Sequence, residues 1–213
     1  MTNQYKDKPY NDYGQWIRQR FPFRVQKISV DAGFSCPNRD GTISHGGCIF
    51  CDNRTFNPSY CQPSKSIAQQ MEEGKAFFRR KYPYMKYLAY FQAYSNTYAP
   101  LDVLKRRYEE ALAVDDVVGL VIGTRPDCIS TELLDYLEEL NRRTFLIVEY
   151  GIESVNDDTL RHINRGHDFE CSRRAIEQTH DCGILTGGHI ILGLPGEDRE
   201  ENIRQASIVS DLK

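Results

Sequence analysis

Three cysteines lie close together in a polar, glycine-rich segment, "GFSCPNRDGTISHGGCIFC", which covers residues 33–51. They are Cys36, Cys48 and Cys51, with eleven residues between the first two and two between the last two. Thiolates are soft ligands that favour zinc, Cu(I) or iron–sulfur clusters. A closed structural zinc site needs four ligands, so three thiols are one short of it.

The residues of this segment leave three interpretations open. Cys61 or His45 could complete a zinc site, or the thiols could hold an iron–sulfur cluster. The thiols could also be ordinary buried side chains, although their grouping in a polar loop argues against this. Motifs elsewhere in the sequence are needed to distinguish a zinc site from an iron–sulfur cluster.

The composition describes an ordinary globular chain. It has 213 residues, of which 40% are hydrophobic and 27% charged, and a formal net charge of −3, so no global field recruits nucleic acid or a membrane. No run approaches the roughly 20 apolar residues of a membrane span. The polar N-terminus has no apolar core of a signal peptide, so we expect a cytoplasmic protein. Seven cysteines in a reducing compartment favour metal or redox chemistry.

Five apolar runs predict β-strands, and amphipathic segments between them predict helices. The predicted strands are 27–32, 87–94, 117–123, 145–151 and 185–193. The predicted helices are 64–82, 100–113, 130–143, 168–182 and a last one from about 197 to the chain end. Strand and helix alternate, which predicts repeated βαβ units, an α/β fold and a parallel sheet.

Parallel sheets bind ligands at the carboxyl ends of their strands, and the cysteine segment follows the first predicted strand directly. The chain stops inside a helical pattern without a C-cap, so we expect a fold that is truncated after about the fifth strand. We divide the chain into residues 1–26, an aromatic-rich segment packing on the sheet, and residues 27–213, the core domain.

The cysteine segment, which ends in Cys-x-aromatic-Cys, resembles the radical S-adenosylmethionine (SAM) superfamily, and within it the Elp3-like and MiaB-like group. Three later motifs also resemble this group: "IGTRPD" (122–127), "EYGIESVNDDTLRHINRGH" (149–167) and "HIILGLPGE" (189–197). The resemblance extends from about Phe21 to Leu212 and implies a partial (β/α) TIM-type barrel. It also implies that Cys36, Cys48 and Cys51 hold three irons of a [4Fe–4S] cluster whose fourth iron binds SAM.

The same resemblance assigns roles around the cofactor. Glu153 would accept hydrogen bonds from the ribose hydroxyls of SAM, and Arg165 would pair with its carboxylate. Thr124 and Arg125 would face the cofactor or the substrate. Two apolar side chains would contact the adenine: Phe50 and Ile191.

One expected motif is missing. Many members carry Gly-Gly-Glu after the second strand, where it binds the amino group of SAM, but this chain reads "FQAYSNTYAP". Ser95, Asn96 and Thr97 offer oxygens there and are loose candidates for binding this amino group.

The resemblance implies an enzyme that cleaves SAM reductively to a 5′-deoxyadenosyl radical, which abstracts hydrogen from a substrate. It implies an electron donor such as flavodoxin or ferredoxin, and tRNA is the leading substrate class because related proteins modify tRNA. The pattern identifies no residue that acts on the substrate. The alternative is a non-catalytic, zinc-stabilised α/β binding module.

Overall fold

A computed structural model describes residues 10, 12–52, 57–80, 82 and 84–212. Within them the chain forms one sheet of parallel strands in the order β1–β2–β3–β4–β5. The strands are β1 (Val25–Val30), β2 (Lys86–Phe91), β3 (Val117–Thr124), β4 (Phe145–Glu153) and β5 (Leu185–Ile190). The predicted α/β fold with a partial parallel barrel is therefore confirmed.

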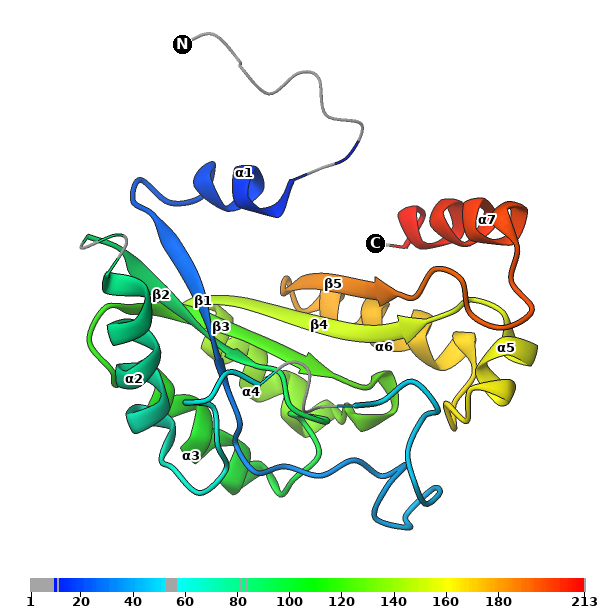
Figure 1. Cartoon of the computed structure of the whole chain (residues 1–213), viewed down its shortest axis with the longest axis horizontal. Helices are drawn as coiled ribbons and strands as arrows, with labels where there is room; N and C mark the ends of the chain where they lie inside the picture. Colours follow the sequence, from blue (N-terminus) through cyan, green and yellow to red (C-terminus); the bar gives the residue numbers. More distant parts are fainter. Residues whose placement is uncertain (1–9, 11, 53–56, 81, 83, 213) are drawn as a thin grey trace, which may run out of the picture.

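The described residues form seven α-helices, most of which link successive strands (Figure 1). They are α1 (Tyr13–Arg18), α2 (Ile67–Arg79), α3 (Leu101–Leu112), α4 (Thr131–Asn141), α5 (Asp157–His162), α6 (Phe169–Asp181) and α7 (Arg199–Ser210), with a short 3-10 helix at Pro126–Cys128. Ser66, Ser130 and Asp168 each cap the start of a helix with their side chains. In the described part of the chain, no helix has the length and apolarity needed to cross a membrane.

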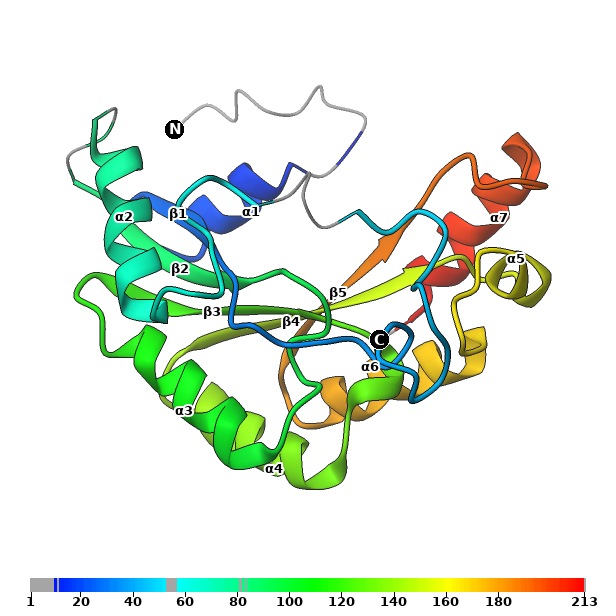
Figure 2. The ribbon, with the colours of Figure 1, turned by 60° about the horizontal axis from the view of Figure 1, so that its bottom comes forward.

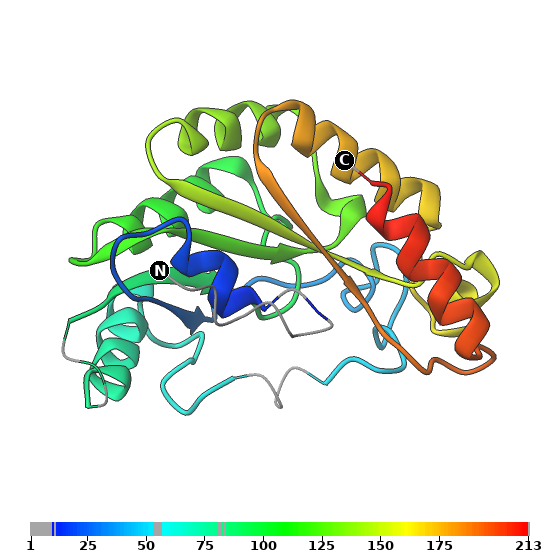
Figure 3. The ribbon, with the colours of Figure 1, turned by 90° about the horizontal axis from the view of Figure 1, so that it is seen from above.

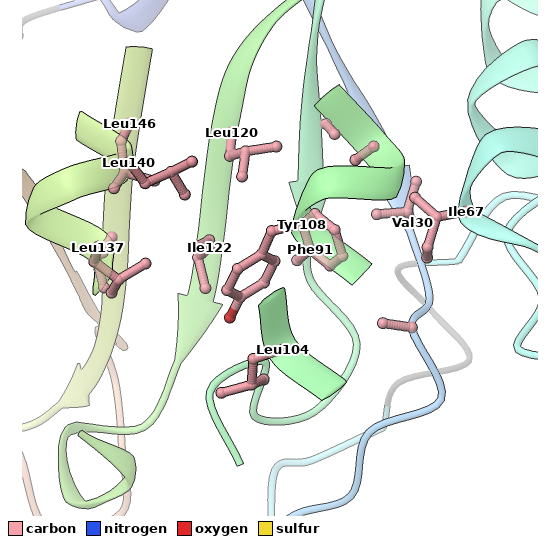
Figure 4. Close-up of a cluster of buried hydrophobic side chains, with 14 of the residues drawn as sticks. Val30, Ile67, Phe91, Leu104, Tyr108, Leu120, Ile122, Leu137, Leu140 and Leu146 are labelled. Atoms are coloured by element: carbon pink, nitrogen blue, oxygen red, sulfur yellow. The ribbon is translucent and has the colours of Figure 1, made fainter. Parts of the chain in front are cut away.

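The outer face of the sheet carries the main core. Helices α2, α3, α4 and α6 cover this face, as Figure 2 shows. Tyr108 of α3 is fully buried and lies edge-on to Phe91 of β2, with the ring centroids 5.1 Å apart. Figure 4 shows these two rings beside Ile122 of β3. Apolar residues at every second strand position account for this face.

The opposite, inner face changes character along the strands. At the amino ends of the strands, Ile17 of α1 packs on Leu88, Val121 and Ile147. Helix α1 therefore covers this end of the inner face, on the side of the sheet opposite α3 and α4 (Figures 2 and 3). Towards the carboxyl ends the inward positions become polar or glycine, and a cavity opens there.

Candidate functional site

The cavity at the carboxyl ends of the strands has a volume of about 350 Å³. It is lined by ten of the residues that the sequence singles out: Cys36, Cys48, Phe50, Cys51, Ser95, Thr124, Arg125, Glu153, Arg165 and Ile191. They come from the loop after β1, from residues at or just after the ends of β2, β3, β4 and β5, and, for Arg165, from the segment after α5. Parallel topology gathers residues that lie more than a hundred positions apart in the chain at one edge of the sheet.

The loop after β1 brings the three thiols to this cavity. In Figure 1 this loop lies on the side towards which the arrows of the strands point. The thiols influence one another: burial raises the pKa of Cys51, Arg39 lowers it, and Cys48 and Cys36 raise it further. All three thiols line the same cavity.

Two asparagines attach this loop to the segment after α5. Asn38 is fully buried, and its Nδ2 donates to the carbonyl oxygen of Asn164 at 2.5 Å. Asn164 has a positive φ of 56° and its own Nδ2 donates to the carbonyl oxygen of Gly47 at 2.8 Å. The loop that carries the thiols is thus fixed to the segment that carries Arg165. Sequence patterns give no signal for this tertiary contact.

Cys48 is the most buried of the three thiols, and hydrogen-bond donors surround it. Nδ2 of Asn38 lies 3.5 Å from its sulfur, Nη1 of Arg165 3.7 Å and Nη1 of Arg125 4.0 Å. Arg125 is only 3% exposed and forks onto Asp127, with Nε–Oδ1 and Nη2–Oδ2 distances of 2.8 and 2.7 Å. Two buried guanidinium groups and one amide therefore direct N–H groups towards the Cys48 sulfur.

Glu153 and Arg165 lie together at the end of β4. Arg165 Nη2 is 3.7 Å from Glu153 Oε1 and donates to the carbonyl oxygen of Gly151 at 2.5 Å. Burial raises the pKa of Glu153, and Arg165 opposes the shift. Glu153 has a φ of 68° at a register shift between β4 and β5. Such backbone is uncommon outside glycine and occurs often at functional sites.

The guanidinium of Arg165 has one buried N–H donor that is not satisfied within the described residues. Among the described residues, its Nε has no hydrogen-bond partner. An orphaned donor on a buried cation is costly unless a ligand completes it. A carboxylate is the ligand that a guanidinium fork fits best.

The residues after β2 are divided between the cavity and the fold. Ser95 and Thr124 line the cavity, whereas Asn96 and Thr97 do not. Asn96 Nδ2 donates to the carbonyl oxygen of Gly123 at 2.8 Å, and the hydroxyls of Thr97 and Thr124 are 2.6 Å apart. Asn96 and Thr97 therefore hold the strand ends together in this structure. Phe50 and Ile191 lie on the cavity wall, with Phe50 38% exposed.

The side chains considered as a fourth zinc ligand lie elsewhere. Cys61 is 4% exposed and packs in the outer core, where burial and the nearby Asp31 raise the pKa of its thiol to about 12. His45 is exposed and pairs with Asp40 in an isolated bridge. Within the described residues, no three His, Cys, Asp or Glu side chains are grouped around a point that could hold one metal ion.

A polar cluster on the inner face was missed by the sequence reasoning. The cluster consists of four inward-facing side chains: Lys27 of β1, Tyr90 of β2, Glu149 of β4 and His189 of β5. The last three of these line the cavity. Charged residues inside otherwise apolar strands are the signal that could have revealed it, because charges are seldom buried without a function or a partner.

Comparisons with known proteins agree with this geometry. The family model of the radical SAM superfamily matches residues 39–205. The protein YtqA of Bacillus subtilis is 43% identical over 206 residues, covering 97% of this chain and 64% of that protein. A tRNA uridine(34) acetyltransferase of Methanocaldococcus infernus is 29% identical over 109 residues, covering 47% of this chain and 20% of that protein. The chain spans a little under two thirds of the length of the first of these curated relatives.

The solved structure of the archaeal Methanocaldococcus infernus Elp3 has the same fold, with a TM-score of 0.60 at 17% identity, covering 86% of this chain and 41% of that one. The resemblance to the Elp3-like and MiaB-like group is thereby confirmed. The matched region includes Cys48 and Cys51 and begins three residues after Cys36. The chain belongs to the radical SAM superfamily, whose cofactors are a [4Fe–4S] cluster and SAM.

Proposed function

We propose that this chain is the catalytic core of an enzyme that cleaves SAM reductively and uses the resulting radical to take a hydrogen atom from a substrate. The observation that carries the proposal is the convergence of three thiols, two buried arginines and Glu153 on one cavity. The family match supports the cofactors, and the cavity supports their place on this chain.

The donor set fits the two cofactors. Three cysteines suit a [4Fe–4S] cluster that keeps one iron open for a further ligand. The partnerless Nε of Arg165 suits the carboxylate of SAM, and the buried carboxylate of Glu153 suits a diol. Glycines at 123 and 151 on the cavity wall leave the inner face without side chains where a ligand has to lie.

Three cysteines and two arginines are placed to bind the cluster. Cys36, Cys48 and Cys51 would hold the cluster, and Arg125 and Arg165 would offset its negative charge. When bound, the cluster and SAM supply the one-electron cleavage that yields a 5′-deoxyadenosyl radical.

The remaining residues bind and shield. Arg165 and Glu153 would fix the two ends of SAM, while Phe50 and Ile191 would contact its adenine and exclude water. Thr124 would face the cofactor from the end of β3, and Ser95 stays the candidate for the amino group.

The cofactor proposal is tested by anaerobic reconstitution with iron and sulfide. We expect a brown protein with about four irons per chain that cleaves SAM when reduced. Cys48→Ala should lose the iron, whereas Cys61→Ala is the matched control and should keep it. A colourless protein that holds one zinc and loses it on Cys61→Ala would instead establish the binding module.

For the substrate we propose tRNA, with a small electron-transfer protein such as flavodoxin or ferredoxin as partner and the cytoplasm as location. The tRNA assignment is supported by the similarity to the acetyltransferase named above. All seven cysteines are free thiols, which suits a reducing compartment. The modified nucleosides of tRNA from cells with and without the gene decide the question, and identical nucleosides would refute it.

A further inference from the structure

Three charged side chains on three strands form a cluster inside the sheet. On β4 and β5 its members precede Glu153 and Ile191, which we assign to SAM. Nζ of Lys27 on β1 lies 2.5 Å from Oε1 of Glu149 on β4. Nε2 of His189 on β5 lies 3.2 Å from Oε2 of the same carboxylate. The side chain of Glu149 is 9% exposed, that of Lys27 21% and that of His189 58%. Lys27 also lies 4.4 Å from the ring centroid of Tyr13 and 4.6 Å from that of Tyr90.

Both carboxylate oxygens of Glu149 have hydrogen-bond partners within the cluster. Each oxygen faces a cation, and its hydrogen bonds outweigh the effect of burial, so the pKa of Glu149 falls to about 2. Burial and the same carboxylate raise the pKa of Tyr90. Glu149 therefore interacts with Lys27 and His189, and the remaining N–H donors of these two side chains can face a ligand.

His189 lines the cavity and is the most exposed member of the cluster. Its pKa is raised, first by the hydrogen bond to Glu149, and further by the charges of Glu149 and Glu153, while burial and Lys27 lower it. With Nε2 directed at Glu149, a protonated imidazole presents the N–H of Nδ1 as its second donor. Lysine, glutamate and imidazolium then sum to one positive charge.

The cluster lies at the right depth to hold a substrate. His189 is two residues before Ile191, which is a separation of about 7 Å along a strand. Glu149 is four residues before Glu153, or about 13 Å. Lys27 and Tyr90 belong to strands whose next inward residues, Ser29 and Gln92, are hydrogen-bonded across the same face at 3.3 Å. A ligand between this cluster and the cofactor residues would touch both.

We propose that the cluster of Lys27, Glu149 and His189 is the substrate-binding end of the cavity, where the imidazolium of His189 donates a hydrogen bond to an acceptor oxygen of the substrate. That oxygen belongs to a carbonyl or a carboxylate group. Glu149 and Lys27 are positioning residues that hold the imidazole in place. The proposal rests on the proposed function, because it takes the radical chemistry to occur in this cavity.

The first test measures the reactivity of His189 in the cluster- and SAM-loaded protein. Diethyl pyrocarbonate acylates neutral imidazole, and peptide mass spectrometry follows each histidine separately. Uridine and acetate are the probes, one with carbonyl oxygens and one with a carboxylate. We expect one of them to slow acylation of His189 by about tenfold at saturation, as one hydrogen bond to a charged group allows. Exposed His180 on α6 is the internal control and should react at an unchanged rate.

Two results of this test would overturn the proposal. One is equal reactivity of His189 with and without either probe. The other is an unchanged pH dependence of His189 acylation in Glu149→Gln, because loss of the carboxylate should make His189 reactive at lower pH. Neither measurement depends on cleavage of SAM, so a protein that fails to cleave SAM would refute the proposed function and leave this test standing.

The second test measures coupling with total tRNA from cells that lack the gene. The readout is product formed per SAM cleaved. His189→Gln should lower this ratio by about tenfold to about a hundredfold, the effect of losing one charged hydrogen bond. His180→Gln should keep the wild-type ratio. A wild-type ratio in His189→Gln would overturn the substrate contact.

Discussion

Replacement of Gly151 by alanine should weaken SAM binding with little effect on the fold. A methyl group at this position would approach Oε1 of Glu153 and Nη2 of Arg165 more closely than the 3.0 Å that real Cβ atoms respect. The backbone at Gly151 has no positive φ, so alanine fits the chain locally. Both side chains that we assign to SAM must then move away from their present places.

The size of the effect follows from the contacts that are disturbed. If the displacement costs one hydrogen bond to a charged group, binding loses about 1.5–3 kcal/mol, which is about tenfold to about 150-fold in Kd. Alanine instead of glycine inside a strand offsets some loss of stability, by about 0.5–1 kcal/mol. We therefore expect a large change in affinity beside a small change in unfolding.

The assay is equilibrium dialysis of SAM against the reconstituted protein, together with thermal unfolding of the same samples. A double-mutant cycle with Glu153→Ala tests the route of the effect. In that background the methyl group has only Arg165 left to displace, so Gly151→Ala should cost less than it does in the wild type.

Two outcomes would refute this reasoning. A Kd within about twofold of the wild type would show that the cavity accepts the methyl group, since that is under 0.5 kcal/mol. Fully additive losses in the cycle would show that the methyl group does not act through Glu153.

Three further predictions concern other parts of the site. Arg165→Lys should raise the Kd for SAM by about tenfold or more in the same dialysis assay, because lysine lacks the planar fork, and an unchanged Kd would remove Arg165 from the carboxylate site. Glu149 has a pKa lowered from 4.5 to about 2, so its stabilisation is present above pH 4.5 and lost as the pH falls towards 2. In urea unfolding between pH 6 and pH 3, the wild type should therefore lose up to about 2 kcal/mol more than Glu149→Gln, and parallel losses would contradict the ion pairs. Asn38→Ala should lower the free energy of unfolding by about 1–3 kcal/mol and reduce the iron content after reconstitution, whereas a wild-type iron content would show that Asn38 does not position the thiol loop.

The strands and longer helices could be predicted from the sequence because each carries one strong periodic signal. The five predicted strands correspond to β1–β5 with small differences at their ends. Helices α1 and α5 were missed because each is only six residues long, too short for a periodic pattern. The cap at Asn156 of α5 was the local signal available.

The site could be predicted where its residues form contiguous motifs, and not where it depends on pairing between distant strands. The cysteine segment and the residues at the ends of β3 and β4 line the cavity together. The positive φ of Glu153 and the contact between Asn38 and Asn164 arise only from tertiary packing. The cluster around Glu149 was missed because its members come from different strands, and nothing in the chain order links them.

The alternation of side chains along the strands has a consequence for how such proteins diversify. On β4, Val148 and Tyr150 are fully buried against the helices, while their neighbour Glu149 points to the cavity. A mutation at the inward positions changes the chemistry offered to a ligand and leaves the helix-packing surface intact. The residues that contact a ligand can therefore be exchanged without disturbing the packing between the sheet and its helices.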